Sequence, residues 1–158
     1  MLGWENFFVA EAGASAALAG LLFVAISINL TRILQFRELP TRAVEALLSL
    51  LSVLIVATFA LIPAQSQTTL GIEMGATGLT MWAFQLVALM RTWKNSHPRA
   101  KSLSRILMNQ LPSLPFFVAG VLLITGHPHG IYWVVPGTLF SFAAGVFGAW
   151  VLLIEIQR

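Results

Sequence analysis

The sequence predicts an all-α membrane protein, a bundle of about five transmembrane helices, from its composition, its apolar run lengths and its charge placement. Hydrophobic residues make up 58% of the 158 residues, and charged residues only 9%. So few polar side chains cannot cover the surface of a water-soluble globule. We therefore expect lipid to surround most of the chain, and residues 1–158 to form a single transmembrane domain.

Five apolar runs have the length of about twenty residues that a helix needs to cross the hydrocarbon of a bilayer. The expected spans are residues 7–30, 43–63, 70–90, 106–125 and 131–154. Pro112 and Pro115 interrupt the fourth run, and proline removes a helical hydrogen bond. A broken or re-entrant helix is therefore an alternative to a continuous fourth span.

Basic residues predict the orientation of these spans. All nine Lys and Arg residues lie in residues 32–42, in residues 91–105 or at Arg158, and none lies in residues 64–69 or 126–130. In a five-helix alternation these positions share one side, which the positive-inside rule assigns to the cytoplasm. We expect the N-terminus outside and the C-terminus in the cytoplasm.

A short pattern occurs near the start of both the first and the third span. Residues 11–16 read EAGASA and residues 73–78 read EMGATG. Two repeated helical hairpins plus one added helix, as found in transporters, are one interpretation. Chance is the other, because membrane helices draw on few residue types.

Polar residues follow one face of each of these spans. Glu11, Ser15 and Asn29 lie close to one azimuth of the first helix, and Glu73 and Thr77 share a face of the third. Carboxylates are unfavourable against lipid. These five residues are therefore candidates for an ion path or for ion coupling, while the alternative for the two acids is that they reach water at the outer surface.

Small residues at three- and four-residue spacing let membrane helices pack closely. Such positions occur on the opposite faces of the first and third spans, and again in the fifth. Since two faces of one helix then need partners, we expect a homo-oligomer; ordinary packing is the alternative. The candidate packing positions are Gly13, Gly20, Gly71, Gly75, Gly78, Gly137 and Gly145.

Both membrane surfaces carry candidate binding residues. Glu11, Glu73, His127 and His129 are expected on the outer side, where carboxylates and imidazoles suit an inorganic cation or protons. The alternative for the histidines is a tight turn at residues 127–130. On the cytoplasmic side, Arg99, Lys101 and Arg105 are candidates for contact with anionic lipid headgroups.

Motifs of enzymes and cofactor proteins do not occur in the sequence. It contains no nucleophile elbow, phosphate loop or zinc-protease motif, and no cysteine for thiolate chemistry. We expect no enzyme, no cofactor and no resident metal. The net charge is only +3 and the basic residues flank apolar runs, so we expect no nucleic-acid partner either.

The opening of the chain resembles a family of small bacterial multi-pass membrane proteins. The resemblance rests on residues 7–10 (FFVA), 13–18 (GASAAL) and 21–30 (LLFVAISINL), with the LPTR turn of residues 39–42. It covers about the first third of the chain. It implies the bacterial inner membrane and carries no activity with it.

Two functions fit these features. The first is an oligomeric ion-conducting channel or ion-coupled transporter, in which the stripe from Glu11 to Asn29 faces an axis or a polar cavity. The second is a non-transporting scaffold or regulatory subunit held to a membrane complex by its small-residue faces. A sensor of outer protonation is a third, less favoured hypothesis.

Overall fold

The computed structural model describes residues 3–36, 39–95 and 110–157, and within them the side chains of all but 91–95 and 155–157. The described residues form helices and turns, without a strand. In chain order the helices are α1 (Glu5–Ile28), α2 (Leu30–Gln35), α3 (Leu39–Ala60), α4 (Gln67–Asn95), α6 (Leu114–Ile124), the 3-10 helix η2 (Pro128–Trp133) and α7 (Val134–Gln157).

Four of the described helical segments are long and apolar enough to cross a membrane, which indicates a membrane protein. They are Glu5–Ile28, Leu39–Ala60, Gln67–Met90 and Pro128–Ile154. These segments overlap the first, second, third and fifth predicted spans. The all-α prediction is thus confirmed, and the described part of the chain has four helices long and apolar enough to cross a membrane.

The fourth predicted span differs. Of residues 106–125, the first four lie outside the described residues, and residues 111–113 form a turn before α6. Helix α6 has 11 residues, so it is about 16 Å long against about 30 Å of hydrocarbon. Pro115 occupies the first turn of α6, where a missing N–H costs nothing, and Pro112 lies just before it. The two prolines therefore interrupt the fourth apolar run, which is the alternative that they raised in the sequence.

Helix boundaries have local causes. Asn29 separates α1 from α2, and its side-chain amide donates to the Ala25 carbonyl at 2.9 Å. At the start of α4, the Ser66 hydroxyl accepts the backbone N–H of Thr69 at 3.1 Å, which satisfies a free donor of the first turn. Before it, Ala64 adopts a positive φ of 56° in the turn that follows α3.

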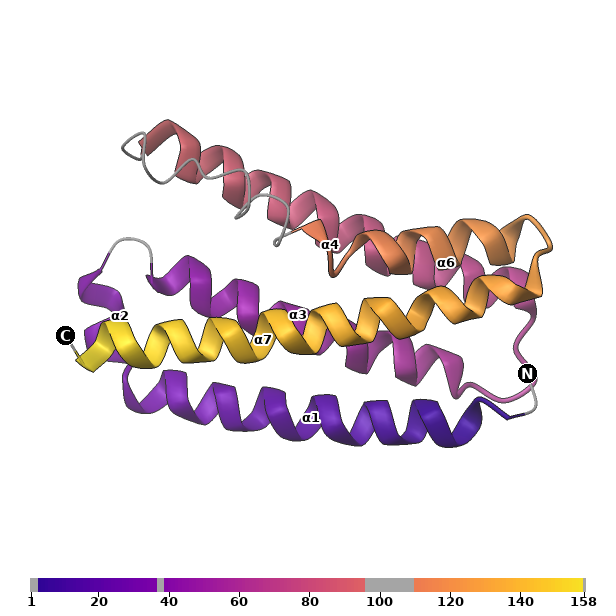
Figure 1. The fold of residues 1–158 in the computed structure, drawn as a ribbon, viewed down its shortest axis with the longest axis horizontal. Coiled ribbons are helices and arrows are strands. Elements are labelled where there is room, and N and C mark those ends of the chain that lie inside the picture. The colour runs from indigo at the N-terminus through magenta and orange to yellow at the C-terminus, as the bar shows by residue number, and fades with distance from the viewer. Residues whose placement is uncertain (1–2, 37–38, 96–109, 158) are drawn as a thin grey trace.

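The bundle has two distinct ends (Figure 1). The N-terminal end holds the start of α1, the 61–66 turn and η2, and the C-terminal end holds α2 and the end of α7. Trp4 packs edge-on against Tyr132 at the N-terminal end, with ring centroids 5.0 Å apart. Helices α1, α4 and α7 run toward the C-terminal end, while α3 and α6 run back (Figure 1).

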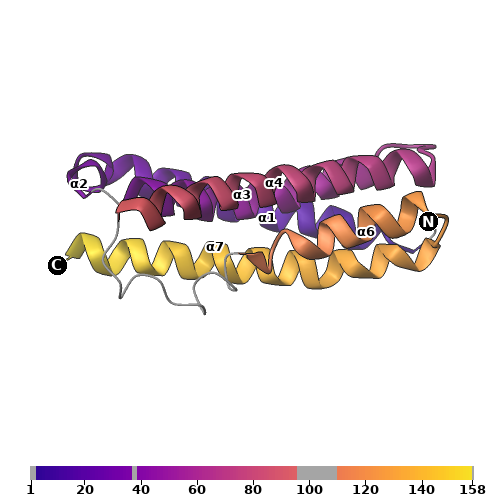
Figure 2. The ribbon, with the colours of Figure 1, turned by 90° about the horizontal axis from the view of Figure 1, so that it is seen from above.

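Helix α3 is central. It contacts α1, α4 and α7. Of its 18-residue apolar stretch 44% is buried inside the bundle, against 17% for the corresponding stretch of α1. Helix α6 packs mainly on α4 and lies beside only the N-terminal half of α7 (Figure 2). One core cluster, at the N-terminal end, joins α1, α3, α4, α6, η2 and α7, whereas the second contains buried residues of α1, α2, α3 and α7 only.

Candidate functional site

The polar stripe of α1 lies on the side of the helix that faces the bundle. Ser15 is fully buried, and its hydroxyl donates to the carbonyls of Glu11 at 2.6 Å and Ala12 at 3.1 Å. Glu11 is half-buried, and its Oε2 has no hydrogen-bond partner among the described residues. Asn29 is also half-buried, at the other end of the helix. The stripe therefore faces protein, and its buried hydroxyl is satisfied by its own helix.

Helix α4 repeats this arrangement. The Thr77 hydroxyl donates to the Glu73 carbonyl at 2.8 Å, as Ser15 does to Glu11. Thr77 is buried and Glu73 half-buried. The two acids also lie at the same distance from the starts of their helices, at Glu5 and Gln67. In addition, the Gln65 side-chain amide donates to Glu73 Oε2, a contact that the Glu11 side chain does not have.

The four predicted residues of the outer cation or proton site all come from the N-terminal half of the bundle. Within the described ranges, no three His, Asp or Glu side chains gather closely enough to hold a metal ion. His127 and His129 are both exposed. His127 Nδ1 lies 3.1 Å from the Thr125 hydroxyl, and the His129 ring stacks on Tyr132. The two histidines thus have local partners within one chain. A cation or proton site formed by several copies of the chain stays a prediction.

Glycines of α4 are covered by α6. A Cβ atom added at Gly71 would lie 2.9 Å from the Gly120 carbonyl oxygen, and one at Gly78 would lie 2.5 Å from the Phe117 backbone nitrogen. A Cβ added at Gly75 would lie 3.7 Å from the Gly120 Cα. Backbone therefore meets backbone along this contact, as close helix packing in a membrane requires. Gly120 was not among the predicted residues, because a lone glycine in the run VAGVLL has no second small residue at the usual spacing.

The other predicted packing glycines divide into two groups. A Cβ at Gly137 would meet the Phe116 ring at 2.7 Å, and one at Gly145 would meet Leu50 at 2.7 Å, so these two pack within the chain. Gly13 and Gly20 are exposed on α1, and an added Cβ would meet nothing within 4 Å at either position. The predicted headgroup residues Arg99, Lys101 and Arg105 lie outside the described residues.

A buried polar contact that we did not predict joins α4 to the start of α6. The Ser113 hydroxyl, 1% exposed, donates to Gln85 Oε1 at 3.1 Å, and Gln85 is 4% exposed. The same hydroxyl also lies 3.1 Å from the Gln110 carbonyl. Gln85 is the one Gln, Asn or charged residue between Glu73 and Arg91, a signal that points to a buried polar role in an apolar span.

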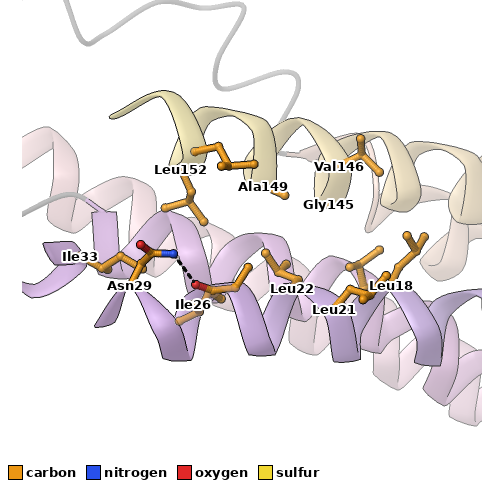
Figure 3. A pocket seen from close by; sticks show the side chains of 13 residues that line it. Leu18, Leu21, Leu22, Ile26, Asn29, Ile33, Gly145, Val146, Ala149 and Leu152 are labelled. Carbon is orange, nitrogen blue, oxygen red and sulfur yellow. Dashed lines mark hydrogen bonds between the residues drawn. The ribbon is translucent and has the colours of Figure 1, made fainter. Parts of the chain in front are cut away.

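A cavity of about 320 Å³ lies between α1 and α7 (Figure 3). Leu50 of α3 contributes to its lining, and Asn29 contributes the only polar side chain among the lining residues. The cavity therefore does not continue the polar stripe from Glu11 as a hydrated path. It is an apolar space in the C-terminal half of the bundle.

Comparisons with known proteins add no function. No protein family, no curated protein and no solved structure matches the chain. The resemblance of the first third to small bacterial membrane proteins therefore remains an expectation from the sequence.

Proposed function

We propose that the protein is an oligomeric membrane scaffold or regulatory subunit, whose copies associate through the exposed small-residue face of α1. We define this α1 seam as Val9, Gly13, Ala16 and Gly20. The observation that carries the proposal is the register shared by α1 and α4. In α4 the face that corresponds to the α1 seam is filled by α6, whereas in α1 it is bare.

The equivalence rests on buried and exposed positions together. Phe8, Ser15 and Ala19 are buried in α1, and the matching residues Leu70, Thr77 and Met81 are buried in α4. On the neighbouring face, Val9, Gly13 and Ala16 match Gly71, Gly75 and Gly78. The three glycines contact α6, while the three α1 residues are exposed.

A second copy of α1 is the occupant that this face suits. The seam places Ala16 and Gly20 four residues apart, which is the small-xxx-small spacing of associating membrane helices, and Gly13 has the same spacing to Ala17 beside the seam. A twofold dimer brings the same patch of both subunits together, so one self-complementary face is sufficient. Lipid chains cannot reproduce the backbone contact that α6 makes with α4.

Core chemistry favours the scaffold over a pore through one chain. The buried hydroxyls of Ser15, Ser49, Ser52, Thr77 and Thr138 each donate to a carbonyl of their own helix, and only the buried Ser141 hydroxyl lacks a partner among the described residues. The cavity between α1 and α7 has a single polar lining side chain, so it does not offer the ring of polar ligands that a conducting path requires.

One test introduces single cysteines, since the natural sequence has none. Gly13→Cys in bacterial membranes should form disulfide-linked dimers on mild oxidation. Ala14→Cys is the matched control, because Ala14 is equally exposed but turned by about 100° around the helix. Equal linkage of the two variants, or none in either, would overturn the α1 interface.

Ion conduction or ion coupling is the second candidate, and Glu11 is the observation that favours it. Its buried Oε2 lacks a partner among the described residues, and a carboxylate within a spanning helix is unfavourable without a function or a partner. In an oligomer, Glu11 and Glu73 would attract protons or inorganic cations. Glu11→Gln should then lower cation flux into liposomes without changing assembly, and wild-type flux equal to that of empty liposomes would remove this candidate.

The proposed setting is the bacterial inner membrane, with the N-terminus outside. Arg32 and Arg42 flank the C-terminal end of the bundle, in accord with a cytoplasmic location for that end. An impermeant thiol reagent should label Ser66→Cys in intact cells and should not label Gln35→Cys. The reverse labelling would invert the orientation.

A further inference from the structure

The cavity between α1 and α7 has the form of a groove. Its floor contains Leu22, Leu50 and Leu152, which are 6%, 2% and 4% exposed. Its rim contains Leu21 and Leu153, which are 69% and 56% exposed. The lining side chains come from α1 and α7 on either side of this space (Figure 3). A space with a buried floor and an exposed rim opens sideways, and the surroundings of a membrane helix are lipid.

The length of the groove matches one leaflet of a bilayer. Its lining on α1 runs from Leu18 to Asn29, a rise of about 16 Å. Half of a hydrocarbon core is about 15 Å thick. The groove therefore extends from the C-terminal end of the bundle to about the middle of the membrane.

The polar end of the groove lies where a lipid headgroup would be. Asn29, whose amide donates to Ala25, is the polar lining residue at this end. Arg32 follows it within one turn and is exposed. An apolar groove whose lining ends at the Asn29 amide and at Ile33, the neighbour of Arg32 in the sequence, complements an acyl chain that ends in an anionic headgroup.

The length of the groove distinguishes the two occupants that a membrane offers. A transmembrane helix crosses both leaflets, about 30 Å of hydrocarbon, whereas an acyl chain is confined to one leaflet. Because the groove lining on α1 rises only about 16 Å, it suits an acyl chain.

We propose that this groove binds one acyl chain of an anionic phospholipid from the leaflet at the C-terminal end, with the headgroup beside Asn29 and Arg32. The site is separate from the α1 seam, because Ala16 is turned by about 180° from the groove residue Ala25. Lipid binding and self-association therefore test independently.

The experiment uses the full chain in vesicles that contain phosphatidylglycerol with a photoreactive diazirine on its acyl chain. After illumination, mass spectrometry maps the adducts. We expect enrichment at Leu21, Ala25 and Val146 over Phe23, an α1 residue that is 60% exposed and outside the groove lining. Uniform labelling of groove and reference residues would overturn the proposal.

Filling the groove provides the matched variants. Ala25→Phe and Ala149→Phe, one from each wall, should reduce groove adducts to the level of Phe23. Ala143→Phe lies on the exposed part of α7 outside the lining and should leave the adducts unchanged. Unchanged groove labelling in both filled variants, with their helical circular dichroism retained, would count against a chain in the groove.

The headgroup has its own readout. Arg32→Gln should lower the preference for phosphatidylglycerol over phosphatidylcholine adducts about fivefold, the ratio expected from one basic residue near an anionic headgroup. No preference in the wild type would overturn the anionic assignment. Disulfide dimers of Ala25→Cys would instead assign the groove to a second copy of the chain.

Discussion

Helices α1 and α4 begin alike but differ in the elements that cover them. Each has an acid at the same depth, a hydroxyl that donates to the carbonyl of that acid, and a small-residue face beside it. Helix α4 lies between α3 and α6, whereas α1 packs mainly on α3. A small-residue face therefore marks a helix contact without indicating whether the partner helix belongs to the same chain.

The repeated-hairpin hypothesis gains from this comparison at the level of the two helix starts. Three matched pairs are buried in both helices, Phe8 with Leu70, Ser15 with Thr77 and Ala19 with Met81, whereas Gly71, Met74 and Gly78 are buried in α4 only. Beyond them the helices diverge, because Gly20 of α1 matches Trp82 of α4. The second helices of the hairpins also differ, since α3 has 22 residues and α6 only 11.

The largest expected loss of stability comes from enlarging a glycine on the face of α4 that α6 covers. Gly78→Leu would force a side chain against the Phe117 backbone and should destabilise the fold by about 3 kcal/mol, at the upper end for overpacking. Gly20→Leu is the matched change in the α1 seam, where an added Cβ would meet no atom within 4 Å. It should leave monomer stability intact and abolish dimers.

Thermal unfolding in detergent, with a mass measurement of the same samples, separates these outcomes. A Gly78→Leu protein as stable as the wild type would contradict the tight contact between α4 and α6. A fully dimeric Gly20→Leu protein would contradict the dimer contact through α1.

An intermediate loss of stability is expected when a buried hydrogen bond that α4 has and α1 lacks is removed. Ser113→Ala would leave Gln85 Oε1 without its donor, at a cost of about 1–3 kcal/mol. The α1 residue that matches Gln85 is Phe23, which is exposed. Ser27→Ala on α1 removes an exposed hydroxyl bonded to its own helix and serves as control. Equal melting temperatures for the two variants would show that the hydrogen bond between Ser113 and Gln85 does not stabilise the fold.

The smallest effects should be shared by both helices. Ser15→Ala and Thr77→Val each remove a hydroxyl that donates to a carbonyl within the same helix, so no buried partner loses its only hydrogen bond. Each should change stability by less than about 1 kcal/mol. A large loss in Ser15→Ala alone, measured by chemical denaturation, would show that the two positions are not equivalent.

The composition and the apolar run lengths of the chain predict that it is helical and apolar, and they predict where most of its long helices lie. Lipid makes these properties local, because every backbone polar group must be satisfied within its own segment. Pro112 and Pro115 also raised an interruption of the fourth apolar run, which lies at the turn of residues 111–113.

Only the tertiary structure decided which small-residue face is occupied, that Gly120 meets Gly71, that Ser113 reaches Gln85, and that a groove lies between α1 and α7. Each of these contacts joins residues far apart in the chain. A periodic pattern reports which face of a helix needs a neighbour, but the identity of the neighbour depends on how the helices pack, and that is a property of the whole bundle.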